Sequence, residues 1–136
     1  MANEVDANGS DAGLTMRLEL VPLAVSDVDR AKAFYVDQVG FHADHDVRPM
    51  DGMRVVQLTP PGSACSVLIG TGMGDLTDRT PGEARGLHLV VQDLEAARAG
   101  LVERGVEISP IQDMGGILYA YFSDPDGNGW ALQQLR

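Results

Sequence analysis

The sequence is poor in cysteine, in basic residues and in long apolar runs. Its single cysteine, Cys65, excludes an internal disulfide and favours a reducing cytoplasm. Ten Lys and Arg residues against 20 Asp and Glu give a formal net charge of −10. This charge argues against nucleic acid and anionic membranes as partners. No apolar run approaches the length of a membrane span. We therefore expect a cytoplasmic protein with neither kind of partner.

The beginning of the chain differs in composition from the rest. It is acidic and rich in Gly, Ala and Asn (MANEVDANGSDAG), without the basic and apolar regions of a signal peptide. The remaining length suits one compact domain with its own core. We predict a disordered acidic tail over residues 1–15 and a single domain over residues 16–136.

An internal repeat predicts the architecture of that domain. Residues 23–33 (LAVSDVDRAKA) and 89–99 (LVVQDLEAARA) share Leu, Val, Asp and two Ala at a constant shift of 66 positions. Asp27 and Asp93 can each cap a helix, and the apolar residues after them follow helical spacing. Each segment is therefore predicted to be a strand that leads into an amphipathic helix.

Extended segments follow both predicted helices. Their pattern of apolar and turn residues predicts strands over 41–47, 54–59 and 66–70, and again over 106–108, 117–122 and 130–135. The chain then consists of two βαβββ modules, residues 16–70 and 86–136, joined by a linker over 71–85. The expected class is α+β, with a curved, cavity-enclosing eight-stranded mixed sheet and the helices outside.

A heavily specified turn, FSDPDGNGW, connects the last two predicted strands. Asp-Pro-Asp-Gly favours a type I turn, and Asn128 and Gly129 tolerate unusual backbone angles. A slip of one residue here would reverse the face of every side chain in the hairpin. The turn therefore fixes which residues point to the same side.

Three segments in order resemble the vicinal oxygen chelate superfamily: VSDVDRAKAFYVDQVGF, VVQDLEAARAGLVERGV and FSDPDGNGW. The resemblance covers about residues 17–136. That family includes glyoxalases, extradiol dioxygenases and bleomycin-type drug-binding resistance proteins. It implies the fold and a homodimer with pockets at or near the subunit interface, but no single activity.

The family's metal-dependent members hold their ion with four side chains. The spacing to the motifs carries these positions over to Leu20, Gln57, Gly86 and Ala131. Leu, Gly and Ala offer no side-chain donor, and one Gln amide cannot hold a transition metal. We therefore expect no metal and no other cofactor.

The resemblance also implies which side chains line the cavity. In the family register Tyr119, Tyr121, Ala131 and Gln133 face inward, while His88 shares the side of Gly86. His88, Gln57 and Gln133 make a poor metal site but a reasonable hydrogen-bonding set. The expected ligand-binding residues are Leu20, Pro22, Gln57, His88, Tyr119, Tyr121 and Gln133. The alternative is that the two Tyr rings fill the interior and that His88 has no role.

Other chemically notable residues are assigned to packing or to the surface. His42 and His45, three positions apart on a strand, are expected on opposite faces and so not in one metal site. Cys65 has no base placed beside it and is expected to be a buried structural residue. Aromatic residues at core spacing, Phe34, Tyr35 and Trp130, are expected in the core.

Three functions remain after these exclusions. The first is a metal-free module that binds a small, partly aromatic molecule, as drug-sequestering relatives of this type do. The second is a metal-independent enzyme with His88 as the acid or base and Tyr119 or Tyr121 polarising a carbonyl. The third is a metal-dependent lyase, isomerase or dioxygenase, which requires a different register from the one given above.

Overall fold

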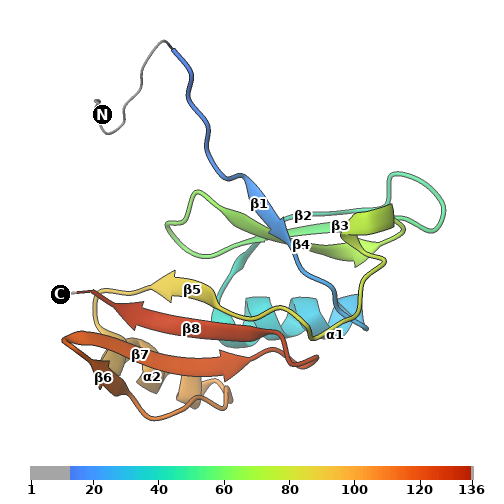
Figure 1. The fold of residues 1–136 in the computed structure, drawn as a ribbon. Helices are drawn as coiled ribbons and strands as arrows, with labels where there is room; N and C mark the ends of the chain where they lie inside the picture. The colour runs from blue at the N-terminus through green and yellow to red at the C-terminus, as the bar shows by residue number, and fades with distance from the viewer. Residues whose placement is uncertain (1–12, 136) are drawn as a thin grey trace.

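The structure, a computed structural model, describes residues 13–135. Residues 1–12 of the predicted tail lie outside the described residues. Figure 1 shows the two modules as separate sheets with their helices. The elements of the first module are β1 (Leu20–Pro22), α1 (Val28–Ala33), the π-helical η1 (Phe34–Val39), β2 (His42–Val47), β3 (Arg54–Thr59) and β4 (Ser66–Thr71).

The second module repeats this order after a short 3₁₀ turn, η2 (Gly74–Leu76). Its elements are β5 (Leu87–Val90), α2 (Leu94–Glu103), β6 (Gln112–Met114), β7 (Ile117–Ser123) and β8 (Gly129–Gln134). The strand orders are β1-β4-β3-β2 and β5-β8-β7-β6. In each sheet the strand before the helix pairs in parallel with the last strand, and the other pairs are antiparallel. The predicted α+β repeat is therefore confirmed.

Both predicted helix starts are confirmed. The Asp27 side chain accepts a hydrogen bond from the Arg30 amide, and that of Asp93 accepts one from Ala96. Each cap satisfies a backbone donor that the first helical turn leaves unpaired. The first helix continues to Gly40 as η1 because the Gly40 and Phe41 amides both donate to the Tyr35 carbonyl.

One predicted strand is wrong. Residues 106–108 form no strand, and Ile108 makes only an isolated bridge to Phe122. The strand of this hairpin is β6, whose three residues are all exposed. β6 therefore has no clear apolar pattern in the sequence. The Gly115-Gly116 pair, which has positive φ at both residues and turns the chain into β7, is a better sequence signal for this hairpin.

A single core joins the two modules. It contains apolar side chains from both helices and from one face of each sheet, among them Tyr35, Leu58, Ile69, Leu94 and Trp130. The eight strands form two four-stranded sheets that are not closed around a shared cavity. Instead, the helix-covered face of each sheet packs its apolar side chains into the core that both modules share. The opposite face of each sheet, called here its free face, points away from that core.

Beside the core, and buried with it, lies a hydrogen-bonded carboxylate, Asp124, from the FSDPDGNGW turn. Asp124 is 5% exposed. Its oxygens accept hydrogen bonds from the Tyr35 hydroxyl (2.8 Å), the Asn128 side chain (2.9 Å) and the amides of Asp126 and Asn128 (both 2.9 Å). The Tyr35 oxygen in turn accepts a hydrogen bond from the Trp130 indole at 2.9 Å. These bonds satisfy a buried charge that would otherwise be costly.

The same turn connects distant parts of the chain. The Asn128 side chain donates to the carbonyl of Ala24 and accepts from the amide of Ala84 in the linker. The Asp126 carboxylate accepts hydrogen bonds from the amide and hydroxyl of Ser26 and lies 3.3 Å from Arg30. The turn therefore connects the second module to the first, in addition to fixing the register of β7 and β8.

An ion-pair network connects α1 to strands β2 and β3 of the first sheet. Arg54 is 9% exposed and lies 2.7 Å from Asp29 on α1 and 2.9 Å from Asp46 on β2. Lys32 also reaches Asp46, at 2.7 Å. Hydrogen bonds from Arg54, and then from Lys32, hold the pKa of the Asp46 carboxyl well below its usual range.

We expect Tyr35→Phe to lower the free energy of unfolding by about 2 to 4 kcal/mol, because it removes one of the hydrogen bonds to the buried Asp124 carboxylate and leaves the Trp130 indole N–H buried without a partner. Burial, and then Asp124, raise the pKa of the Tyr35 phenol far above its usual range, so the hydroxyl remains a donor. Urea unfolding followed by circular dichroism measures the change. The matched control is Tyr121→Phe, whose hydroxyl lies on an exposed face; a similar loss in both variants would contradict the prediction.

The Asp46 network predicts a dependence of stability on pH. Because the folded pKa of Asp46 is lower than its unfolded value of about 3.9, its contribution is complete above about pH 5 and is lost progressively at lower pH, as the pH falls from the unfolded pKa toward the folded one. At neutral pH, Asp46→Asn should therefore be less stable than the wild type. Urea unfolding of both proteins between about pH 7 and pH 3 should show this difference shrinking in acid. A difference that is constant or grows in acid would contradict the assignment.

Candidate functional site

The free face of the second sheet brings four of the predicted ligand-binding residues together. Strand register places His88, Ala131 and Tyr121 in one row across β5, β8 and β7. The adjacent row contains Val90, Gln133 and Tyr119. Residues that pair directly point to the same side of a sheet. His88, Tyr119, Tyr121 and Gln133 therefore share one surface, around the small side chain of Ala131.

The two tyrosines form a flat aromatic surface. Their ring centroids are 6.2 Å apart, and the ring planes differ by 4°. Gln133 donates a hydrogen bond to the Tyr119 hydroxyl at 3.1 Å, which fixes that ring in the row. Tyr121 remains 42% exposed. This pair offers a π surface that is oriented by the sheet and accessible from outside.

His88 lies at the side of this aromatic surface, edge-on to Tyr119, with 6.1 Å between ring centroids. Its Nδ1 lies 2.6 Å from the Gly86 carbonyl oxygen, which can only accept. Nδ1 therefore carries the proton, and Nε2 of the neutral ring is an acceptor. Gly86 has a φ of 79°, a conformation that favours glycine and directs its carbonyl toward the ring.

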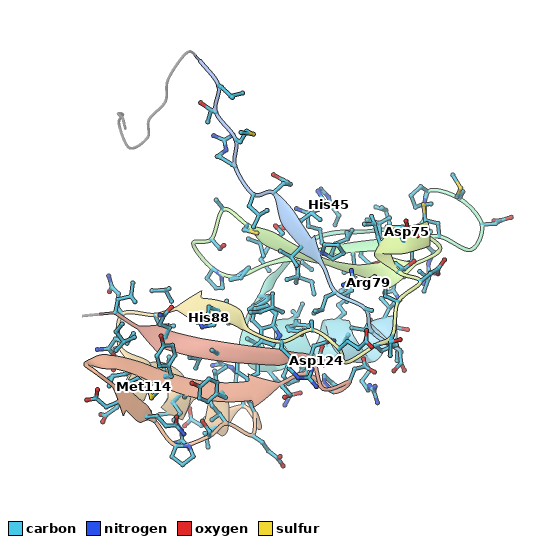
Figure 2. The ribbon with its side chains drawn as sticks, in the orientation of Figure 1. His45, Asp75, Arg79, His88, Met114 and Asp124 are labelled. Carbon is cyan, nitrogen blue, oxygen red and sulfur yellow. The ribbon has the colours of Figure 1, made fainter. Side chains whose placement is uncertain are left out.

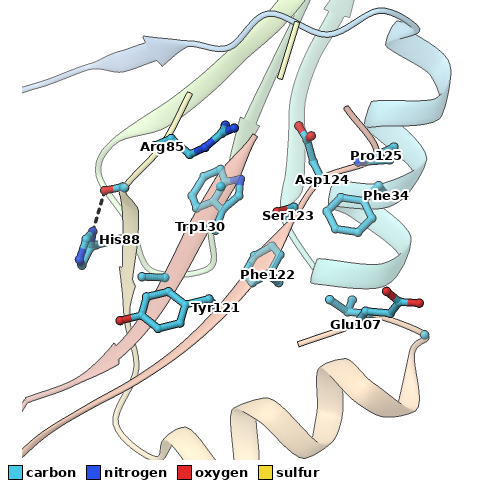
Figure 3. A pocket seen from close by; sticks show the side chains of 15 residues that line it. Phe34, Arg85, His88, Glu107, Tyr121, Phe122, Ser123, Asp124, Pro125 and Trp130 are labelled. Carbon is cyan, nitrogen blue, oxygen red and sulfur yellow. Dashed lines mark hydrogen bonds between the residues drawn. The ribbon is translucent and has the colours of Figure 1, made fainter. Parts of the chain in front are cut away.

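A pocket of about 700 Å³ opens beside this row. Figure 3 shows His88 and Tyr121 on one side of it, and Phe34 and Glu107 on the other. Its floor includes Phe122 and Trp130, at the end of the sheet. Arg85 forms part of the rim, where it donates to the carbonyls of Gly82, Ala84 and Gly127. The pocket is therefore mainly apolar, with polar groups at its rim.

The remaining predicted residues lie on the free face of the first sheet, not in this pocket. Register places Leu20 beside Ser66, and Pro22 beside Leu68, which in turn pairs with Gln57. The Gln57 side chain donates to the Ser66 hydroxyl at 3.1 Å. Within one chain the seven predicted residues thus form two sets, one on each sheet.

The prediction that His42 and His45 lie on opposite faces is wrong, and so is that of a buried Cys65, which is only partly buried. A bulge in β2 between Ala43 and His45 pairs His42 with Thr59 and His45 with Gln57, and these partners share the free face. In a regular strand, residues three apart point to opposite faces. The residue inserted by the bulge brings His45 back to the same face as His42. Figure 2 shows His45 on the first sheet, apart from His88 on the second. Over residues 13–135, His, Cys, Asp and Glu form no group of three or more suited to a metal.

Comparison with known proteins identifies the family. Residues 17–132 match the Glyoxalase/Bleomycin resistance protein/Dioxygenase superfamily. The chain belongs to this superfamily. The resemblance predicted from the three sequence motifs is thereby confirmed. None of the curated proteins compared with the chain matches it.

Several solved structures share the fold of this superfamily member. TnmS3, an antibiotic binding protein from Streptomyces sp. CB03234, is 35% identical, with a TM-score of 0.78 over 90% of this chain and 98% of its own. A glyoxalase/bleomycin resistance protein from the same strain is 36% identical, with a TM-score of 0.73 over 87% and 100%. A superfamily member from Sphaerobacter thermophilus DSM 20745 is 33% identical, with a TM-score of 0.77 over 89% and 98%.

The superfamily implies a metal position, and the residues present do not fit one. Leu20 and Gln57 lie on the first sheet, and Gly86 and Ala131 lie at the second. Three of these side chains have no donor atom, and the Gln57 amide is bonded to Ser66. A divalent transition metal needs imidazole, carboxylate or thiolate ligands. No chemical step is therefore assigned to a metal.

Sequence reasoning missed several residues of the pocket. Ser123 continues the alternation of Tyr119 and Tyr121, so extending the predicted strand by one residue would have found it. Glu107 was assigned to a strand that does not form. Arg85 reaches the pocket only through contacts of the linker with the final turn, for which the local sequence holds no signal.

Along residues 13–135, no helix is long and apolar enough to cross a membrane.

Proposed function

We propose that this protein binds a small, partly aromatic molecule, without a metal, against the free face of its second sheet. Tyr119 and Tyr121 stack on the ligand, while His88 and Gln133 give it polar contacts. The role is sequestration or resistance in the cytoplasm. The observation that carries the proposal is the parallel, accessible pair of tyrosine rings beside the 700 Å³ pocket.

The chemistry of this surface suits such a ligand. Binding sites for small molecules are typically apolar and aromatic, with a few oriented polar groups. His88 offers an acceptor at Nε2, which would suit a hydroxyl or N–H on the ligand. With Glu107 and Asp124 on the pocket wall and a net charge of −10, a neutral or weakly cationic molecule is favoured.

Similarity to TnmS3 supports the same class of function. That protein is named an antibiotic binding protein and is 35% identical to this chain over nearly its whole length. We therefore propose aromatic antibiotics as the ligand class. The lack of metal donors at Leu20, Gly86 and Ala131 supports binding rather than the metal-dependent reactions of other superfamily members.

We further propose that two copies assemble as a homodimer. The free faces expose large apolar side chains: Val47 (48%) on the first sheet, and Val90 (61%), Met114 (58%) and Tyr121 (42%) on the second. Exposed apolar surface of this kind is typical of interaction sites. The first sheet of one copy, with Leu20, Pro22 and Gln57, would then complete the pocket over the second sheet of the other.

A second candidate function is proton transfer without a metal. The observation that favours it is the bond from His88 Nδ1 to the Gly86 carbonyl, which leaves Nε2 as an acceptor beside Tyr119 and Tyr121. Such a histidine can act as a general base. Recovery of the bound compound separates the two functions: a binding module returns it unchanged, whereas an enzyme returns a product that His88→Ala does not form.

The test uses two probes: doxorubicin, a planar aromatic antibiotic, and bleomycin. We expect at least one probe to raise the melting temperature of the wild type, and Tyr121→Ala to weaken its binding by about tenfold, because a stacked ring is lost. Tyr121→Phe keeps the ring and should bind within about twofold of wild type. Fluorescence titration gives the affinities. An affinity that is unchanged in Tyr121→Ala would contradict the proposed surface, and no binding of either probe would contradict this ligand class.

A further inference from the structure

The first sheet contains a continuous line of hydrogen-bonded polar side chains, called here the polar chain. The Gln57 amide nitrogen lies 3.1 Å from the Ser66 hydroxyl, which in turn lies 2.6 Å from the hydroxyl of Thr59. The Thr59 hydroxyl donates to the Asp44 carboxylate, whose other oxygen lies 2.8 Å from His42 Nδ1. The polar chain therefore crosses β4, β3 and β2 and leads to a charge at the bulge of β2.

The charge of Asp44 fixes the direction of every bond in the polar chain. A carboxylate only accepts, so the Thr59 proton points to Asp44. The Thr59 oxygen must then accept from Ser66, and this bond uses the single Ser66 proton. The Ser66 oxygen is left to accept, and only the NH₂ group of the Gln57 amide can donate to it. The orientation of the Gln57 amide therefore follows from the charge of Asp44.

The surroundings of the polar chain maintain this direction. The hydrogen bond from Thr59, and then the one from His42, lower the pKa of the Asp44 carboxyl, so it is ionised at neutral pH. Ser66 is 5% exposed, which shields its two bonds from water. A Gln57 amide turned the other way would place its oxygen against the Ser66 oxygen, with no proton between them. The amide is therefore held in one orientation.

This orientation leaves the carbonyl oxygen of Gln57 available to a ligand. No residue over 13–135 donates a hydrogen bond to it, including His45, which pairs with Gln57 across β2 and β3. Pro22 and Leu68, its neighbours on the free face of the first sheet, have no side-chain donor. The Gln57 side chain is half-buried. A ligand without a donor would leave this oxygen covered and unpaired, which costs binding free energy.

We propose that the polar chain makes this protein select ligands that carry an N–H or O–H group, which donates to the carbonyl oxygen of Gln57. Asp44, Thr59 and Ser66 are positioning residues, which hold the amide and do not contact the ligand. The inference rests on the proposed function, in whose homodimer Gln57 of one copy faces the second sheet of the other. It narrows the ligand class to aromatic molecules with a hydrogen-bond donor.

Two probes that differ in one group test the selection. The probe 2-aminoanthraquinone has an N–H donor on a planar aromatic ring system, whereas 2-(dimethylamino)anthraquinone has none, and both are uncharged at neutral pH. We expect the wild type to bind the amino probe about tenfold more tightly, because the other probe leaves a half-buried acceptor unpaired. Gln57→Met has a similar length but no amide, and should lower this ratio to below about threefold. Fluorescence titration gives the affinities.

Variants of the polar chain test the positioning residues. Thr59→Val keeps the shape of the side chain but breaks the line, and should also lower the ratio to below about threefold, whereas Thr59→Ser keeps the hydroxyl and should retain the ratio within about twofold. Asp44→Asn, on the exposed strand β2, is a second break, because an amide at this position can donate and so removes the fixed direction.

A readout without a ligand tests the polar chain itself. Nuclear magnetic resonance titration should show the pKa of the Asp44 carboxyl rising in Thr59→Val and unchanged in Thr59→Ser, because the Thr59 hydroxyl is the largest cause of its lowering. An Asp44 pKa that is the same in Thr59→Val and in the wild type would overturn the polar chain. Far-ultraviolet circular dichroism confirms that the variants remain folded.

The outcomes separate this inference from the proposed function. Equal binding of the two probes to the wild type would overturn the selection alone. A preference that persists in Gln57→Met would overturn the role of the amide, since shape would then explain it. A preference that persists in Thr59→Val and in Asp44→Asn would overturn the positioning role. Binding of neither probe would overturn the inference, and the proposed function would fail with it only if doxorubicin and bleomycin also do not bind.

Discussion

The buried Asp124 carboxylate is the interaction on which the rest of this structure depends. It accepts one hydrogen bond from the Tyr35 hydroxyl of the first module and three from donors in its own turn. A buried charge is tolerated only when it is fully hydrogen-bonded, so the turn, η1 and β8 must be in place together. Asn128 and Asp126 extend the same constraint to Ala24, Ala84 and Ser26. One turn therefore aligns two modules that share few other polar contacts.

This constraint leads directly to the candidate site. Because the turn fixes the register of β7 against β8, Phe122 and Trp130 enter the core while Tyr121 and Ala131 face outward. The same register places Gln133 against Tyr119 and orients the aromatic surface. The core thus supports the sheet from one side, and its free face remains partly exposed. A binding surface on strands is more precisely positioned than one on loops.

The sequence was informative where structure depends on neighbouring residues. The Asp27 and Asp93 caps, the final hairpin and the shared face of Tyr119 and Tyr121 all follow from local spacing. The packing of the two modules against each other cannot be predicted from local spacing, since it depends on long-range contacts such as that of Tyr35 with Asp124. The residues expected to line one cavity therefore lie apart in the single chain, with Gln57 on the first sheet and His88 on the second. The bulge that realigns His42 and His45 is one inserted residue, which periodicity cannot detect.

The central claim is that this superfamily member binds its ligand without a metal. The most direct measurement is the metal content of the purified, untagged protein after it is soaked with Zn²⁺, Ni²⁺, Mn²⁺ and Fe²⁺ and then desalted. The positions of Leu20, Gly86 and Ala131 lack donors, so we predict no stoichiometric metal, and no difference between wild type and His88→Ala. Near-stoichiometric metal that is lost in His88→Ala would contradict the claim and place this chain among the metal-dependent enzymes.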